Sequence, residues 1–164
     1  MGNSPADGQV GVFSIEGSPP ISVDIMTNVF GIPYRKIKHL KDRTLAIQDI
    51  RVIDPIYLFQ SKCHCLLGLN QADQQDEKHL QMLCLPVPEH IKGLLDEVDA
   101  GRLTQRALIN EIKFLQKILK RSQIERAVSQ IEIDPKSLIP FNCLMKFKLT
   151  KVVRFASVAY GTGE

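Results

Sequence analysis

The chain has 164 residues, of which 44% are hydrophobic and 24% are charged, and its formal net charge is +3. This composition predicts a small domain with one hydrophobic core. No apolar run approaches the roughly 20 residues of a membrane-spanning helix. The N-terminus is polar and has no apolar signal segment. The composition therefore argues against a membrane protein, and we expect the chain to be cytoplasmic.

Charge is unevenly distributed between the two parts of the chain. Residues 1–100 contain 9 Lys and Arg against 13 Asp and Glu, a net charge of −4, whereas residues 101–164 contain 12 against 5, a net charge of +7. A basic half of this kind can contact the phosphates of a nucleic acid. Solvated helix faces rich in lysine are the other interpretation of this charge.

Two apolar segments near the N-terminus predict strands. Residues 10–15 are bounded by Gly8 and Gly17, and residues 21–26 follow two prolines that hold the chain extended. Together they predict an antiparallel pair.

A second hairpin is predicted between residues 34 and 47. Gly31 and Pro33 break the chain, and residues 34–40 and 44–47 are the predicted strands on either side of a turn. The segment is strongly basic, with Arg35, Lys36, Lys38, His39, Lys41 and Arg43. Such charges protect an edge strand from aggregation, and contact with phosphate is the alternative.

Residues 50–53 predict a further strand, which leads into a helix. Asp54 and Pro55 mark the start of that helix, because Asp is a preferred N-cap residue and Pro a preferred first residue. The next predicted helix starts at Asp73 or Asp76 and runs to about Leu85. The later helical segments, in chain order, are 89–99, a helix that begins after Thr104, 123–131, a single turn at 134–140, and 149–160. The helix after Thr104 has a core face with apolar residues at the helical period: Leu108, Ile112, Leu115 and Leu119.

Two polar residues in the helical part are candidates for a site. Lys62 falls on the same helix face as the apolar Leu58 and Leu66. A lysine on an apolar face needs an anion, and Asp76 is the expected partner. His79 shares a face with Asp76, and either a structural hydrogen bond or a substrate contact would explain it.

The triplet Cys63-His64-Cys65 invites a metal-binding interpretation. Residues two apart on a helix point in directions about 200° apart, so the two thiolates cannot readily bind one ion. We therefore expect reduced, mostly buried thiols.

Three segments between residues 21 and 83 occur in a characteristic order: an acidic strand, a strand that leads into a helix, and an acidic helix start. They are residues 21–26 (ISVDIM), 50–62 (IRVIDPIYLFQSK) and 75–83 (QDEKHLQML). This order resembles the later half of a nucleotidyltransferase-fold domain of the antitoxin-associated type. The resemblance implies that Asp24 is the third metal carboxylate of the family. It also implies that Lys62 steers the triphosphate, that Asp76 orients Lys62, and that His79 is a nucleotide contact.

Two motifs of the resembled family have no match in this sequence: a Gly-Ser turn and an Asp-x-Asp strand. Gly17-Ser18 lies too close to Asp24, and that strand carries one acid. One carboxylate cannot hold the two divalent ions that neutralise a triphosphate. We therefore expect no cofactor on this chain alone and no nucleotidyl transfer by it. Mg²⁺ would bind if a longer chain or a partner completed the site.

The predicted class is α+β, with a small antiparallel or mixed sheet followed by a helical part. Residues 1–53 are the predicted partial nucleotidyltransferase-like sheet, residues 54–100 the helices that complete it, and residues 101–164 a basic helical region. A sheet without its acidic strand has an open edge, which predicts a homodimer through residues 10–15 or 21–26. The first predicted function is a truncated or degenerate nucleotidyltransferase-like protein. The alternative is a non-catalytic module that binds a protein at the sheet edge or RNA through the basic half.

Overall fold

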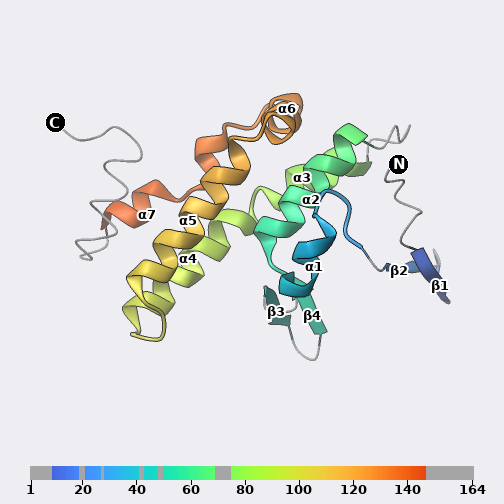
Figure 1. The fold of residues 1–164 in the computed structure, drawn as a ribbon, viewed down its shortest axis with the longest axis horizontal. Coiled ribbons are helices and arrows are strands. Elements are labelled where there is room, and N and C mark those ends of the chain that lie inside the picture. Colours follow the sequence, from blue (N-terminus) through green and yellow to red (C-terminus); the bar gives the residue numbers. More distant parts are fainter. Residues whose placement is uncertain are drawn as a thin grey trace.

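The computed structural model describes residues 9–18, 21–26, 28–40, 43–47, 50–68 and 75–146. Its elements are, in chain order, β1 (Gln9–Ile15), β2 (Ile21–Met26), α1 (Tyr34–Leu40), β3 (Thr44–Ile47), β4 (Ile50–Ile53), α2 (Pro55–Gly68), α3 (Gln75–Leu83), α4 (Pro86–Asp99), α5 (Gln105–Leu119), α6 (Ser122–Gln130), a 3-10 turn (Pro135–Leu138) and α7 (Phe141–Lys146). The described strands all precede α2, and from α2 onward the described chain is mostly helical (Figure 1). The predicted α+β class is confirmed.

The strands form two separate antiparallel hairpins. β1 pairs with β2, with Val12 opposite Asp24, and β3 pairs with β4, with Leu45 opposite Val52. The predicted pairing of the first two strands is confirmed. The described strands do not join into the single N-terminal sheet that the sequence predicted, and α1 lies between the two hairpins along the chain.

The predicted strand at residues 34–40 is wrong, because this segment is α1. Ile37 and Leu40 are three positions apart, which places both on one helix face, and both pack in a cluster with Tyr57. The first turn is closed by Lys36 N–H, which donates to the carbonyl of Pro33 at 2.7 Å. Four of the basic residues predicted for an edge strand, Arg35, Lys36, Lys38 and His39, therefore lie on a short helix, and Arg43 follows that helix.

Asp54 starts α2 in the predicted way. Its Oδ1 accepts hydrogen bonds from the backbone N–H groups of Ile56 and Tyr57, both at 3.0 Å. These bonds satisfy two donors that have no partner within the helix. Pro55 occupies the first helical position, where its missing N–H costs nothing. The helix runs through the middle of the molecule and contacts α3, α4 and α6 (Figure 1).

The main hydrophobic core is formed by α2 and the helices after it. Ile56 and Phe59 on α2 and Ile91 on α4 are fully buried. The apolar face predicted after Thr104 is confirmed on α5, where four residues are buried: Leu108, Ile112, Leu115 and Leu119. α4 and α5 lie side by side (Figure 1). The core thus extends along the whole helical part, as far as Leu144 on α7.

The turn between α4 and α5 has the predicted boundaries. Gly101 follows the end of α4 with φ of +74°, a conformation that glycine adopts without a steric cost. The Thr104 hydroxyl accepts a hydrogen bond from Ala107 N–H at 3.2 Å and so caps α5.

The end of the described chain matches the prediction in part. α6 agrees with the predicted segment 123–131 to within one residue, and Asp134 caps the 3-10 turn by accepting a hydrogen bond from Lys136 N–H at 2.9 Å. α7 was not predicted, and the predicted helix at 149–160 lies outside the described residues. Within the described ranges, none of the helices has the length and apolar character needed to cross a membrane.

Candidate functional site

Two of the predicted site residues form an ion pair between α2 and α3. Lys62 Nζ donates to Asp76 Oδ1 at 2.9 Å, which confirms the predicted pairing. Asp76 is buried in the first turn of α3, whereas the Lys62 side chain is 29% exposed. The second carboxylate oxygen, Asp76 Oδ2, is buried and accepts no hydrogen bond from the described residues. The carboxylate is thus the more enclosed partner of the pair.

His79 lies three residues after Asp76, beside an open groove between α2 and α3. The α2–α3 groove has a volume of about 320 Å³ and is lined by Leu58, Lys62, His79, Met82, Leu83 and Pro86. Its walls are mainly apolar, and the Lys62 ammonium and the His79 imidazole are the polar groups that line it. The structure therefore brings together three of the four predicted residues.

Asp24, the fourth predicted residue, belongs to another part of the molecule. It lies in β2, and its side chain is outside what the structure describes. The β1–β2 hairpin lies at one end of the molecule in Figure 1, whereas α2 and α3 lie near the middle. The fold therefore does not place Asp24 beside the Lys62–Asp76 pair. Among the described residues, no group of three or more His, Cys, Asp or Glu side chains could hold a metal ion.

The cysteines of the Cys63-His64-Cys65 triplet are free thiols, as expected, and both are buried. Burial raises the pKa of Cys63 to about 12 and also raises the pKa of Cys65. His64 packs against the backbone of Gly31, where an added Cβ would collide with the imidazole ring. Burial lowers the pKa of His64, and the charge of Arg121 acts in the same direction.

A second charged cluster joins three elements that are distant in the sequence. Arg43 Nε donates to Asp54 Oδ2 at 2.7 Å, at the start of α2. Its two terminal nitrogens donate to the two carboxylate oxygens of Glu111 on α5, one of them at 2.6 Å. Asp54 and Glu111 are both buried. We call these three residues the Arg43 cluster.

Aromatic rings and a small cavity border the Arg43 cluster. The guanidinium carbon of Arg43 lies 5.4 Å from the ring centre of Tyr57 and 5.2 Å from that of Phe114, within the range of cation–π attraction. Burial alone would lower the pKa of Arg43, but hydrogen bonds and charges from Glu111 and Asp54 outweigh it and raise that pKa. Both carboxylates are thus bonded to the one guanidinium, which is typical of a structural ion cluster.

His90 on α4 lines the cavity beside this cluster. The cavity has a volume of about 170 Å³. Burial lowers the pKa of His90, while the charges of Asp54 and Glu111 act in the opposite direction. The imidazole thus lies, partly buried, next to charged groups that already have partners.

Four cations gather where α1 approaches the end of α5. We call Arg35, Lys36, Lys117 and Arg121 the basic cluster. α1 packs beside Phe114, and Lys117 and Arg121 follow Phe114 by three and seven residues along the chain. Burial lowers the pKa of Lys36, and the three neighbouring cations lower it further. In the part of the chain that the structure describes, none of the four forms an ion pair with an acid.

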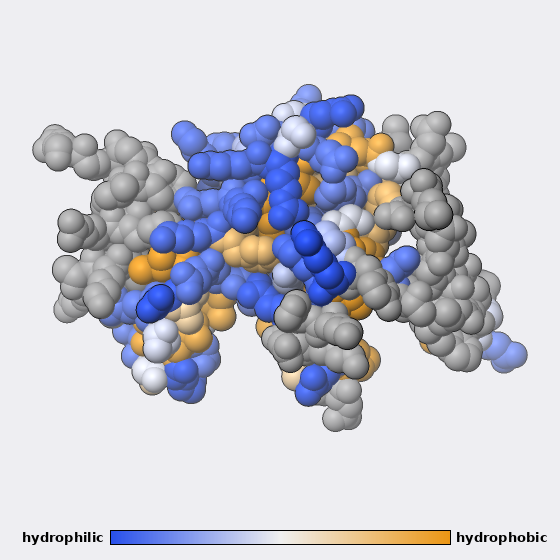
Figure 2. All heavy atoms as spheres, in the orientation of Figure 1, coloured by the Kyte–Doolittle hydropathy of each residue, from blue (hydrophilic) through white to orange (hydrophobic). Residues whose placement is uncertain are grey.

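The surface around this cluster is hydrophilic. Figure 2 shows hydrophilic side chains over α1 and α6 on one face of the molecule. Arg35 and Lys117 are exposed, and Lys36 and Arg121 are partly exposed. The four charges are therefore accessible to a partner from solvent.

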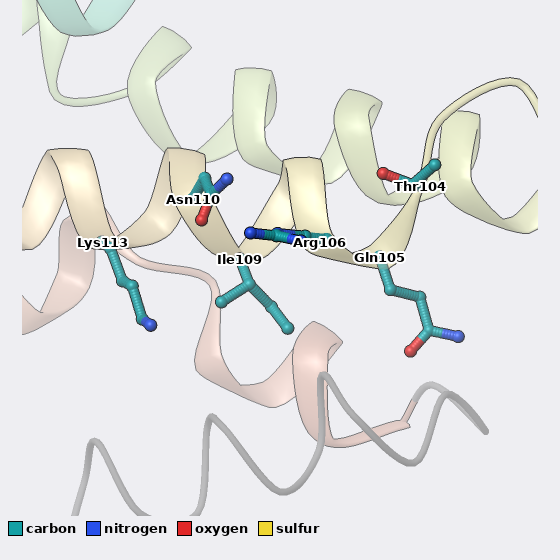
Figure 3. Close-up of a pocket in the computed structure, with 6 residues that line it drawn as sticks. All are labelled: Thr104, Gln105, Arg106, Ile109, Asn110 and Lys113. Atoms are coloured by element: carbon teal, nitrogen blue, oxygen red, sulfur yellow. The ribbon is translucent and has the colours of Figure 1, made fainter.

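A further pocket, of about 570 Å³, lies along the first turns of α5. Its lining residues are Thr104, Gln105, Arg106, Ile109, Asn110 and Lys113 (Figure 3). All six belong to α5 or to its N-cap, and Gln105, Ile109 and Lys113 extend from one side of the helix. Since the described lining groups all come from one helix, we assign no site to this pocket.

The Arg43 cluster and the basic cluster were not predicted from the sequence. One signal for the first was present: Glu111 lies between Leu108 and Ile112 on the apolar face of α5, where a carboxylate needs a cation. For the basic cluster, the sequence indicated the charge of residues 101–164 and the basic segment 34–47 separately, and only the fold brings Arg35 and Lys36 near Lys117 and Arg121. Comparison with family models, with curated proteins and with solved structures gave no match.

Proposed function

We propose that the chain is a non-catalytic interaction module that binds the phosphate backbone of a nucleic acid at the basic cluster. Two observations support this proposal: α1 packs beside Phe114 of α5, and Arg35, Lys117 and Arg121 lie close enough to Lys36 for their charges to lower its pKa. Like charges held close together repel one another and oppose folding. An anionic partner would relieve that repulsion, and phosphates do so with release of counterions.

The character of the cluster fits backbone contact better than base recognition. Lysine and arginine bind phosphate oxygens without reading sequence. Aromatic residues, on which single-stranded bases stack, are 6% of the chain. Two described rings that pack with α1, Tyr57 and Phe114, already lie against the Arg43 guanidinium. We therefore expect binding that depends strongly on salt and weakly on sequence.

The experiment compares the affinity of the full chain for fluorescent RNA and DNA hairpins of one sequence over a range of salt concentrations. The double variant Lys117→Gln/Arg121→Gln should lower the affinity at least about tenfold and should reduce the slope of log K against log [salt] by about 2, because two phosphate contacts are lost. Arg106→Gln/Arg126→Gln is the matched control: it removes two exposed cations from α5 and α6 outside the cluster.

Two results would contradict the proposal. Equal losses in the cluster variant and the control variant would mean that only total charge matters. Equal binding of polyglutamate, with the same dependence on Lys117 and Arg121, would point to an acidic protein as the partner. The affinities for the RNA hairpin and the DNA hairpin show which nucleic acid is preferred.

The resemblance to nucleotidyltransferases stays a prediction, as do the cytoplasmic location and the homodimer. The resemblance implies one site that contains Asp24 as a metal carboxylate and Lys62 as a phosphate contact, whereas in this fold β2 lies apart from α2 and α3. Incorporation of labelled nucleotide by the isolated chain with Mg²⁺, lost in Asp24→Asn, would favour the enzyme over the interaction module.

A further inference from the structure

The α2–α3 groove is bordered by apolar surface that the described fold leaves uncovered. Met82 and Leu85 are 69% and 74% exposed, although Leu80 on the inner side of α3 is fully buried. Leu83 and Pro86 continue this apolar surface into the groove. Exposed apolar side chains gathered beside a concave site are typical of a surface that binds another protein.

Exposed residues of α3 and of the turn after it form a row along which a second helix could lie. Lys78, Met82 and Leu85 follow one another at spacings of four and three along α3 and the turn after it, so they lie on one side. A row of this length extends about 10 Å, or two helical turns. The groove volume of about 320 Å³ leaves room for a few aliphatic side chains.

The rim of the groove is cationic. Lys62 uses one of its N–H donors on Asp76 Oδ1 and is 29% exposed, so its charge reaches the groove. His79 also lines the groove, and Lys78, the preceding residue on α3, is exposed. Asp76, the acid paired with Lys62, is buried. An occupant with acidic residues beside an apolar stripe would therefore complement this rim.

We propose that the α2–α3 groove docks an amphipathic α-helix of a partner protein, with its aliphatic side chains in the groove and its Asp or Glu residues facing Lys62 and Lys78. Docking of a helix by its apolar face is a common mode of peptide recognition. This surface is independent of the basic cluster. Lys62 lines the groove, whereas His64, two residues later on α2, lies near Arg121 of the basic cluster. Since residues two apart on a helix point to opposite sides, the groove and the basic cluster lie on different sides of α2.

The test uses a synthetic helical peptide with leucines at helical spacing bordered by glutamates, and a matched peptide with lysines in place of the glutamates. The full chain carries isotope-labelled Met and Leu methyl groups. The acidic peptide should shift the methyl signals of Met82 and Leu85 and should bind at least about tenfold more tightly than the basic peptide.

Two substitutions locate the contact. Met82→Glu should weaken binding of the acidic peptide at least about tenfold, because it removes apolar contact and adds a repelling charge. Ile50→Glu on β4, which changes a residue of similar exposure (66%), should leave the affinity unchanged. Leu85→Glu is a second variant of an exposed residue and should weaken binding in the same way.

Three outcomes would overturn the proposal. Methyl signals that do not move would mean that the groove does not accept a helix of this chemistry. Equal affinities for the acidic and basic peptides would mean that the peptides bind only by non-specific apolar contact. Sedimentation would also contradict the proposal if the unsubstituted chain is a dimer and the Met82→Glu variant is a monomer. In that case the groove would bind a second copy of this chain.

Discussion

At the scale of single residues, the two partners of the Lys62–Asp76 pair differ in their access to water. The carboxylate is buried, whereas the lysine side chain is 29% exposed. An ammonium without its partner can extend to solvent, but a buried carboxylate cannot. We therefore expect Lys62→Met to lower the free energy of unfolding by about 1–3 kcal/mol. Asp76→Asn should lower it less, as chemical denaturation would measure.

The double variant K62M/D76N is the control for a direct interaction. It should lose less stability than the sum of the two single variants, because neither charge is left without a partner. Additive losses would show that the two residues act separately. Lys92→Met, which breaks an exposed pair with Glu89, should change stability much less than Lys62→Met.

At the scale of elements, the Arg43 cluster fixes the β3–β4 hairpin to the helices. Arg43 bonds to Asp54 before α2 and to Glu111 on α5. Arg43→Met would leave two buried carboxylates without their cation, and we expect it to lower the free energy of unfolding by about 3–5 kcal/mol. Arg102→Met is the matched control, since Arg102 also makes two bonds to one carboxylate, that of Glu97, but at the exposed surface. Equal losses of unfolding free energy in Arg43→Met and Arg102→Met would mean that burial of the Arg43 cluster does not increase its contribution to stability.

Elements were predictable where the signal is local. The N-caps at Asp54 and Thr104 depend on hydrogen bonds to N–H groups two or three residues away, and such signals can be read from the sequence. The partner of Lys62, at a separation of 14 residues, could be inferred because both helices were predicted. The Arg43–Glu111 contact spans 68 residues and depends on how α5 packs on the hairpin, which no local pattern encodes.

The wrong prediction of a strand at α1 is also explained by contacts that are distant in the sequence. Its seven residues include two, Ile37 and Leu40, that pack in the core at helical spacing, and this signal is too short to distinguish a helix from a strand. Tyr57 and Phe114, which complete that core cluster, come from α2 and α5. Tertiary packing therefore decides the conformation of α1.

At the scale of the whole molecule, the β1–β2 hairpin is a sheet of two strands. Each strand has a described neighbour on one side, and an unpaired edge can accept a strand from a second copy. We expect a homodimer through this edge, which sedimentation velocity at micromolar concentration would detect. A folded, soluble monomer under these conditions would contradict the prediction. Met82→Glu should leave this dimer intact, which separates the hairpin edge from the α2–α3 groove.

The long sequence separation within the Arg43 cluster also bears on the order of folding. Closing a loop of this length costs more conformational entropy than forming the short-range contacts between successive helices. The helical core from α2 to α6 can therefore assemble before Arg43 reaches Glu111, and the β3–β4 hairpin joins it late. In the reverse direction, we expect the hairpin to separate from the helices before the helical core unfolds. Transient opening would uncover Asp54 and Glu111 to water while the helices remain packed, so local unfolding would begin at the hairpin.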